Sequence, residues 1–304
     1  MLNSRERVQH TIQGLPVDRV PLGELVVDPA FCLKALRCQR FSFPVAREFW
    51  QRFNLDLVVL PPLQEGFGSL ETEIMDKDSW SLERWRKETD YYIFSLVNGG
   101  FSRALASMGF RSFMEATVRD PDRVKQSIRR FFVQALEEVE EAALAGGDGI
   151  IIGDDLAYQK GTYISPAALR QQYFPFLQEF LEQACEQGLT VFFHSDGNLE
   201  EILADLVQAG VHGLQGLEPA AGMDLNNIRE MYGHKVCLMG NLDLAYLQDG
   251  VEEDAVKKGV ARVMETGKPG RRFIFGTCSG LHESLSVEKV ELMYQEALRQ
   301  GKYL

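Results

Sequence analysis

The sequence predicts an α/β protein folded as a (β/α)8 TIM barrel with N-terminal helical and hairpin additions. Strand and helix patterns alternate five times after residue 148, as a parallel sheet requires. The strands are continuous apolar runs, typical of a sheet covered on both faces. With the earlier strands, the count reaches about eight. A doubly wound open sheet is the alternative, but no Gly-rich nucleotide motif follows a strand.

The composition fits one domain spanning residues 1–304. Hydrophobic residues make up 45% of the chain and charged residues 25%, so a full core can form. No linker separates the two halves of the sequence. The length of 304 residues suits one large barrel.

Charge and cysteine content narrow the functional classes. The net charge of −12 disfavours nucleic acid or an anionic membrane as the main partner, and we expect a small-molecule substrate. No apolar run approaches the roughly 18 residues of a membrane span, and the polar start does not resemble a signal peptide. We expect a reduced, cytoplasmic protein without disulfides, because its five cysteines are scattered: Cys32, Cys38, Cys185, Cys237 and Cys278.

The first half of the chain predicts helices, one clear strand and an insert. An amphipathic helix covers residues 3–13, a turn and an extended segment follow to residue 22, and residues 42–53 form another helix. Residues 55–60 form a buried strand. Short antiparallel strands within residues 71–97 predict a hairpin insert over one barrel end. Asp120 and Pro121 begin a long helix that runs through the acidic residues 136–144.

The second half predicts the regular barrel. Its expected strands are residues 149–152, 190–193, 213–216, 235–239 and 272–275. The first expected helix begins at Ser165. The others cover residues 174–187, 199–208, 225–231, 252–265 and 287–299.

Polar side chains follow each of these strands. One such strand end is uninformative, because these residue types often cap the next helix. Five in succession at one face of a parallel sheet indicate an enzyme pocket. The residues are Asp154, Asp155, His194, Asp196, Glu218, Asn241, Asp243, Thr277, Cys278 and Ser279.

His194 is the leading catalytic candidate. It directly follows an apolar strand, so its ring should be partly shielded and could titrate near neutral pH or bind a metal. A satisfied structural histidine is an equally good reading. Asp196 and Asp155 could point into the same pocket as His194 and act as general acids. Asp154 would then point toward the helices. Metal ligands would come from His194 and Cys278, with Cys237 or His282 as weaker alternatives.

Several stretches resemble the uroporphyrinogen decarboxylase superfamily, including its corrinoid-linked methyltransferase branch. They are residues 5–21 (RERVQHTIQGLPVDRVP), 153–180, 193–225, 232–243 and 284–290. The resemblance implies a TIM barrel with its site at the C-terminal face. In true decarboxylases, arginines after the Asp-Arg-Val-Pro turn grip the substrate's carboxylates. Here that segment reads Leu22-Gly23-Glu24 without arginine, which disfavours a polycarboxylate.

The methyltransferase branch implies zinc held by a His-x-Cys pair and a later cysteine. His194 matches the first ligand, and Asp196 stands where the first cysteine would be. The later position falls on Ser279, so either a one-residue loop shift brings in Cys278 or the thiolate site is absent. Asp196 can ligate zinc, and such a site would favour a metal-bound water or alkoxide over a thiolate.

The leading functional hypothesis is methyl transfer between a small methylated compound and a corrinoid protein. His194, Asp196 and Asp155 would orient or protonate the substrate or hold zinc, and the residues lining the pocket would be Glu218, Asn241, Asp154 and Glu24. A second hypothesis is decarboxylation of a small acid or tetrapyrrole. A third is a non-catalytic barrel that binds a ligand or a corrinoid protein.

Overall fold

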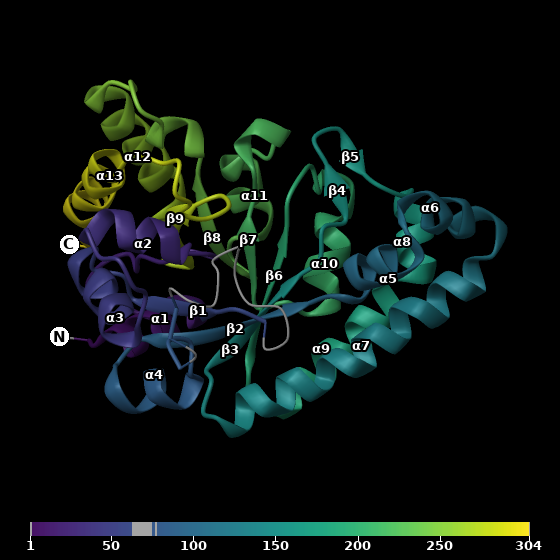
Figure 1. The fold of residues 1–304 in the computed structure, drawn as a ribbon. Coiled ribbons are helices and arrows are strands. Elements are labelled where there is room, and N and C mark those ends of the chain that lie inside the picture. Colours follow the sequence, from purple (N-terminus) through teal and green to yellow (C-terminus); the bar gives the residue numbers. More distant parts are fainter. Residues whose placement is uncertain (1, 63–74, 77, 304) are drawn as a thin grey trace.

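The protein is a parallel α/β barrel (Figure 1). The computed structural model describes residues 2–62, 75–76 and 78–303. Seven strands form one sheet in the order β1-β2-β3-β6-β7-β8-β9, and each neighbouring pair is parallel. Their bounds are Leu57–Leu60, Tyr92–Asn98, Gly149–Gly153, Thr190–Ser195, Gly213–Gly216, Cys237–Leu242 and Phe273–Thr277.

A short segment near the N-terminus, residues 21–23, closes the gap between β9 and β1 and is called the closing segment below. Leu22 forms a parallel bridge with Phe275. The Phe275 N–H donates to Pro21 O, and the Gly23 N–H donates to Phe275 O, at 2.9 and 3.0 Å. On the other side, the Asp56 N–H donates to Leu22 O at 2.7 Å, just before β1. These bonds close the ring, so the expected barrel fold is confirmed, but the sheet has seven strands in the described residues and an isolated bridge stands in place of the expected eighth.

Thirteen α-helices surround the sheet in the described part of the chain (Figure 1). The first seven are α1 Ser4–Gln13, α2 Pro29–Leu36, α3 Phe43–Arg52, α4 Leu82–Glu88, α5 Gly100–Met108, α6 Phe110–Arg119 and α7 Pro121–Leu144. The others are α8 Pro166–Gln172, α9 Phe174–Glu186, α10 Leu203–Ala209, α11 Leu225–Tyr232, α12 Glu253–Gly267 and α13 Val287–Gln300. A small antiparallel hairpin, β4 Ala157–Tyr158 and β5 Gly161–Thr162, follows β3.

The core has two parts because successive strand residues point to opposite faces of the sheet. Val58 and Ile150 belong to the large cluster that packs under the helices. Ile151 and Phe192 belong to a separate, smaller cluster inside the barrel. Val8 of α1 joins this inner cluster, so α1 covers one end of the barrel and leaves the carboxyl ends of the strands for the site.

The prediction of a hairpin within residues 71–97 is wrong for the part of this segment that the structure describes. Leu82–Glu88 forms helix α4, whose first turn is capped by the Ser81 hydroxyl accepting from the Arg84 N–H. Tyr92–Asn98 is β2, a barrel strand between β1 and β3. The expected strand at residues 71–74 lies outside the described residues. The aromatic residues that suggested antiparallel strands here serve a core, since Trp85 is fully buried.

Two further expectations can be compared with the structure. All five cysteines are free thiols, as the scattered spacing predicts. Among the described helices, none combines the length and the apolar character that a bilayer crossing needs.

Asp56 holds the closing segment in place. Its fully buried carboxylate accepts from Arg7 Nη1 at 2.8 Å and from Arg19 Nη1 at 2.6 Å. It also accepts from the Leu22 N–H at 2.9 Å and from Ser4 Oγ at 3.0 Å. A buried charge is tolerated only when such partners replace its water shell. The network therefore ties α1, the closing segment and β1 together.

Replacing this carboxylate should destabilise the protein strongly. We expect Asp56→Ala to lower the free energy of unfolding by about 3–5 kcal/mol, because it removes the carboxylate that pairs with Arg19 and one of the two that pair with the buried Arg7. Denaturant unfolding followed by circular dichroism measures the change. Asp249→Ala, at an exposed position, is the matched control and should stay within about 0.5 kcal/mol of the wild type. Equal stability of the two variants would contradict the role of Asp56.

Candidate active site

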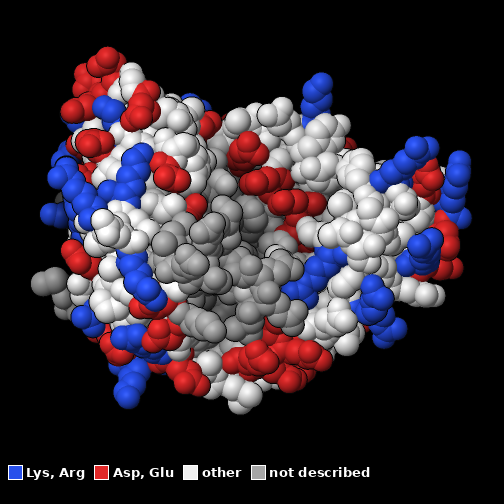
Figure 2. Space-filling model, in the orientation of Figure 1, with Lys and Arg blue, Asp and Glu red and all other residues white. Residues whose placement is uncertain are grey.

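A cavity of about 500 Å³ lies at the carboxyl ends of the barrel strands. In the view of Figure 2, acidic side chains gather beside a hollow over the region of β6 and β7. The described residues that line the cavity include no lysine or arginine. They are Leu25, Val26, Asp28, Pro62, Leu96, Asn98, Ser102, Gly153, Asp155, His194, Ser279, Gly280, Leu281 and His282.

Three side chains that could bind a metal ion lie close together at this cavity. His194 lies near the end of β6, and its Nε2 is 3.9 Å from Asp155 Oδ1 and 3.9 Å from Asp196 Oδ1. One ligand atom from each residue lies within 4.8 Å of the others. His194 is buried, whereas the two carboxylates are about half exposed. The structure thus brings together the three residues that the sequence suggested as catalytic.

Backbone hydrogen bonds fasten the loops that carry these carboxylates. The Asp196 N–H donates to Asp155 Oδ1 at 2.9 Å, which joins the loop after β6 to the loop after β3. The Asp155 N–H in turn donates to Ser102 Oγ at 3.1 Å. The Leu156 N–H donates to Ser195 Oγ at 3.1 Å. These hydrogen bonds hold the two loops, and the loops in turn position the two carboxylates.

Gly197 allows the two loops to approach this closely. Its φ of +87° is favourable only for glycine, and a Cβ there would lie 2.6 Å from the backbone of Ala157. Its N–H donates to Glu218 Oε2 at 3.1 Å. Glu218, at the end of β7, thus lies beside this cluster, where it supports the loop of Asp196.

The environment of Asp196 raises the pKa of its carboxyl group. Burial raises the pKa of Asp196 above its ordinary value, and His194 opposes this rise. The nearby charges of Asp155 and Glu218 raise the pKa further. A carboxyl group that holds its proton at higher pH can act as a general acid.

Two of the expected substrate-binding carboxylates lie away from solvent. Asp154 is fully buried and accepts from the N–H groups of Phe101 and Ser102, at the start of α5. Burial raises the pKa of Asp154 to about 6. Its neighbour Asp155 faces the mouth, so the alternation expected for this pair agrees with the structure. The expected place of Asp154 in the pocket lining does not agree with the structure, because its carboxylate is buried.

Glu24 is also an internal residue. Its carboxylate accepts from Tyr294 Oη at 2.6 Å and from the Thr277 N–H at 3.1 Å. Burial raises the pKa of Glu24 to about 7, although the hydrogen bonds from Thr277 and Tyr294 lower it. The expectation that Glu24 lines the pocket does not match this placement, because its oxygens are engaged inside the protein.

Asn241 and Cys278 lie outside the cluster of His194. Asn241 lines a second cavity, and its Nδ2 donates to Leu217 O at 2.9 Å. Cys278 is buried, and burial raises the pKa of its thiol to about 12. Among the described residues, the potential metal cluster contains Asp155 in the place where Cys278 was expected. Cys237 lies in the inner core, as predicted.

Sequence reasoning missed Asn98 and Ser102 as lining residues. Asn98 ends β2, so it stands at a strand end like the polar residues that were found. Its signal was hidden because the preceding run was interpreted as part of a hairpin. His282, a weaker metal candidate, lines the cavity but does not belong to the metal-ligand cluster.

A family model described as uroporphyrinogen decarboxylase (URO-D) matches residues 81–299, more than half of the chain. The chain belongs to the uroporphyrinogen decarboxylase family. No curated protein matched the chain. The structure is similar to that of a methyltransferase from Methanosarcina mazei, at 19% identity and a TM-score of 0.77, covering 98% of this chain and 99% of that one. A D-allulose 3-epimerase from Methylomonas sp. is similar at 11% identity and a TM-score of 0.48, with coverages of 93% and 97%.

The donor set of the mouth fits zinc. A catalytic zinc ion commonly has three protein ligands and one open position, and it accepts imidazole nitrogen and carboxylate oxygen at about 2.0–2.2 Å. Ligand atoms on one ion then lie about 3.4 Å apart. The separations around His194 Nε2 are 3.9 Å, and all three ligand atoms lie within 4.8 Å of one another. Asp155, His194 and Asp196 would hold the ion.

Metal content should follow the cluster at the mouth. We expect one zinc ion per chain to bind the wild type and to be lost or weakened at least tenfold in His194→Ala, Asp155→Asn and Asp196→Asn. Cys278→Ser should retain the metal. Isothermal titration with zinc and elemental analysis of the purified proteins measure both. Loss of zinc in Cys278→Ser together with retention in Asp155→Asn would show that the thiol, not the aspartate, is the ligand.

The buried Glu24 should make stability depend on pH. Because folding raises the pKa of Glu24 from 4.5 to about 7, its contribution is present in acid and is lost as the pH rises through that window. The free energy of unfolding should therefore decline as the pH rises. Glu24→Gln should remove a few kcal/mol of this decline, at about 1.4 kcal/mol per pKa unit. Urea unfolding between about pH 5 and 8 measures it, with Glu179→Gln as an exposed control. An unchanged slope in Glu24→Gln would refute this assignment.

Proposed function

We propose that this protein transfers a methyl group between a small methylated compound and a corrinoid carried by a partner protein. The observation that carries the proposal is the cluster of Asp155, His194 and Asp196, of which Asp155 and His194 line a cavity whose described lining has no lysine or arginine. The likeness to a methyltransferase structure supports it, since the two chains cover each other almost fully.

The charges of the cavity argue against a polycarboxylate substrate. A tetrapyrrole with several carboxylates needs cationic partners, as buried or half-buried anions are costly without them. The described lining instead contributes Asp28 and Asp155, and Glu218 lies beside the cluster. A neutral or cationic methyl donor meets no such repulsion.

The same cluster suits the chemical demand of demethylation. When a C–O or C–N bond breaks, its electron pair stays on the leaving atom while the methyl carbon moves to the acceptor. That developing charge must be neutralised by a proton or a Lewis acid. Bound zinc would supply the Lewis acid. His194, Asp155 and Asp196 would hold it, and without it Asp196 would hold the proton.

The loops around the cluster would keep the reacting groups in place. The hydrogen bond from the Asp196 N–H to Asp155 and the bond from the Gly197 N–H to Glu218 fix the carboxylates before substrate arrives. Such preorganisation removes the cost of ordering these groups during the reaction.

Decarboxylation remains the second candidate, because the chain belongs to a family described by that activity. A protonated Asp196 could donate the proton that replaces the lost carboxylate. The absence of cations from the described cavity lining favours methyl transfer over this reaction for a tetrapyrrole.

The two reactions can be separated directly. We expect the zinc-loaded protein to methylate reduced free cobalamin from at least one donor among methanol, methylamines and methyl thiols. His194→Ala and Asp196→Asn should lower kcat/KM by about a hundredfold or more, because the leaving atom loses its activation. Asp249→Asn should behave as the wild type. Carbon dioxide release from uroporphyrinogen, with no transfer from any donor, would reverse the ranking.

A further inference from the structure

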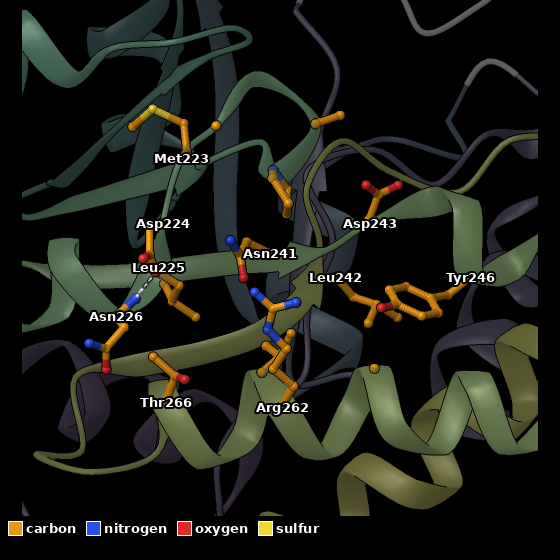
Figure 3. A pocket seen from close by; sticks show the side chains of 15 residues that line it. Met223, Asp224, Leu225, Asn226, Asn241, Leu242, Asp243, Tyr246, Arg262 and Thr266 are labelled. Atoms are coloured by element: carbon orange, nitrogen blue, oxygen red, sulfur yellow. Dashed lines mark hydrogen bonds between the residues drawn. The ribbon is translucent and has the colours of Figure 1, made fainter.

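A second cavity, of about 540 Å³, opens between α11 and α12 at the ends of β7 and β8 (Figure 3). It shares no lining residue with the cavity that contains His194. Its volume lies in the range of small-molecule sites, which are about 300–1,000 Å³. The cavity is therefore large enough for a ligand of its own.

Arg262 is the cationic residue of this cavity. It extends from α12 toward Asn241 of β8 (Figure 3). Among the residues that the structure describes, it forms no hydrogen bond or ion pair. Glu265 is three residues further along the same helix, a spacing that commonly gives an ion pair. Arg262 is an exposed residue, so its guanidinium donors are open both to solvent and to a ligand in the cavity.

The other polar groups of the cavity offer acceptors. Asp224 and Asp243 each use one carboxylate oxygen to cap the following helix, by accepting from the N–H groups of Asn226 and Ala245. Asn241 uses its Nδ2 on Leu217 O, so its Oδ1 remains as an acceptor. The two aspartates repel a multiply charged anion, while all three residues can accept hydrogen bonds from a ligand.

The wall behind the guanidinium is rigid. Gly259 lies one turn before Arg262 on α12, and a Cβ at that position would approach Leu242 and Tyr246 to 3.2 Å. The helix therefore packs tightly on the end of β8. This packing holds the backbone of α12, from which Arg262 extends, beside the cavity.

We propose that this cavity binds a small carboxylic acid that also carries a hydroxyl or ammonium group. The planar guanidinium of Arg262 matches a carboxylate with two parallel hydrogen bonds. The hydroxyl or ammonium group donates to the acceptors on Asp224, Asp243 or Asn241. The proposal is independent of methyl transfer, because it involves a separate set of residues.

Four matched probes test the ligand chemistry by isothermal titration. Butyrate carries only the carboxylate, γ-hydroxybutyrate and γ-aminobutyrate add a donor at the far end, and inorganic phosphate is a compact anion. We expect saturable binding of one of the two donor-bearing probes, at least about fivefold tighter than that of butyrate and of phosphate. No saturable binding of either donor-bearing probe, or tighter binding of phosphate, would overturn the proposal.

Variants locate the site. Arg262→Gln should weaken binding of the preferred probe by about tenfold or more, and Arg262→Lys should lie between it and the wild type, since lysine keeps the charge without the fork. Lys258→Gln, at an exposed position one turn earlier on α12 that does not line the cavity, should bind as the wild type. His194→Ala should also retain binding. Unchanged affinity in Arg262→Gln, or loss in His194→Ala with matched thermal stability, would refute this site.

Discussion

The buried charge of Asp56 is the constraint on which the barrel depends. A carboxylate without water must find partners, and here they come from α1, the closing segment and the turn before β1. The walls of the active-site cavity come from both sides of that closure. Val26 and His282 lie on one side, and Asn98 and Asp155 lie on the other. An interaction near one end of the strands thus determines whether the opposite end forms a cavity.

The regular second half of the fold could be predicted from sequence, and much of the first half could not. Each strand of the second half is followed by polar residues and then by a helix, as around His194, and side chains cap some of these helices, such as α8 and α11. In residues 80–97 these signals conflict. Trp80 and Trp85 suggest strands, but the Ser81 cap decides for a helix. The closing segment at Leu22 has too few residues to be distinguished from an ordinary extended turn.

The site was predictable where strand geometry alone fixes the side chain. His194 and Asp196 are two residues apart and share the mouth, as alternation requires. Asp154 and Glu24 were misplaced because a carboxylate can also satisfy the start of a helix or an internal hydroxyl. Which partner it meets depends on α5 and α13, whose positions no local pattern contains. The same holds for the cluster around His194, which contains Asp155 and not Cys278.

The contact at Gly197 has a consequence for selectivity. Because the two carboxylate-bearing loops are hydrogen-bonded to each other and packed backbone to backbone, neither can move without the other. The fold therefore holds the backbone spacing of the two carboxylate-bearing residues. A metal ion bound by this pair would have to accept that spacing, which would disfavour ions such as Ca²⁺ that need a wider shell of six to eight oxygens.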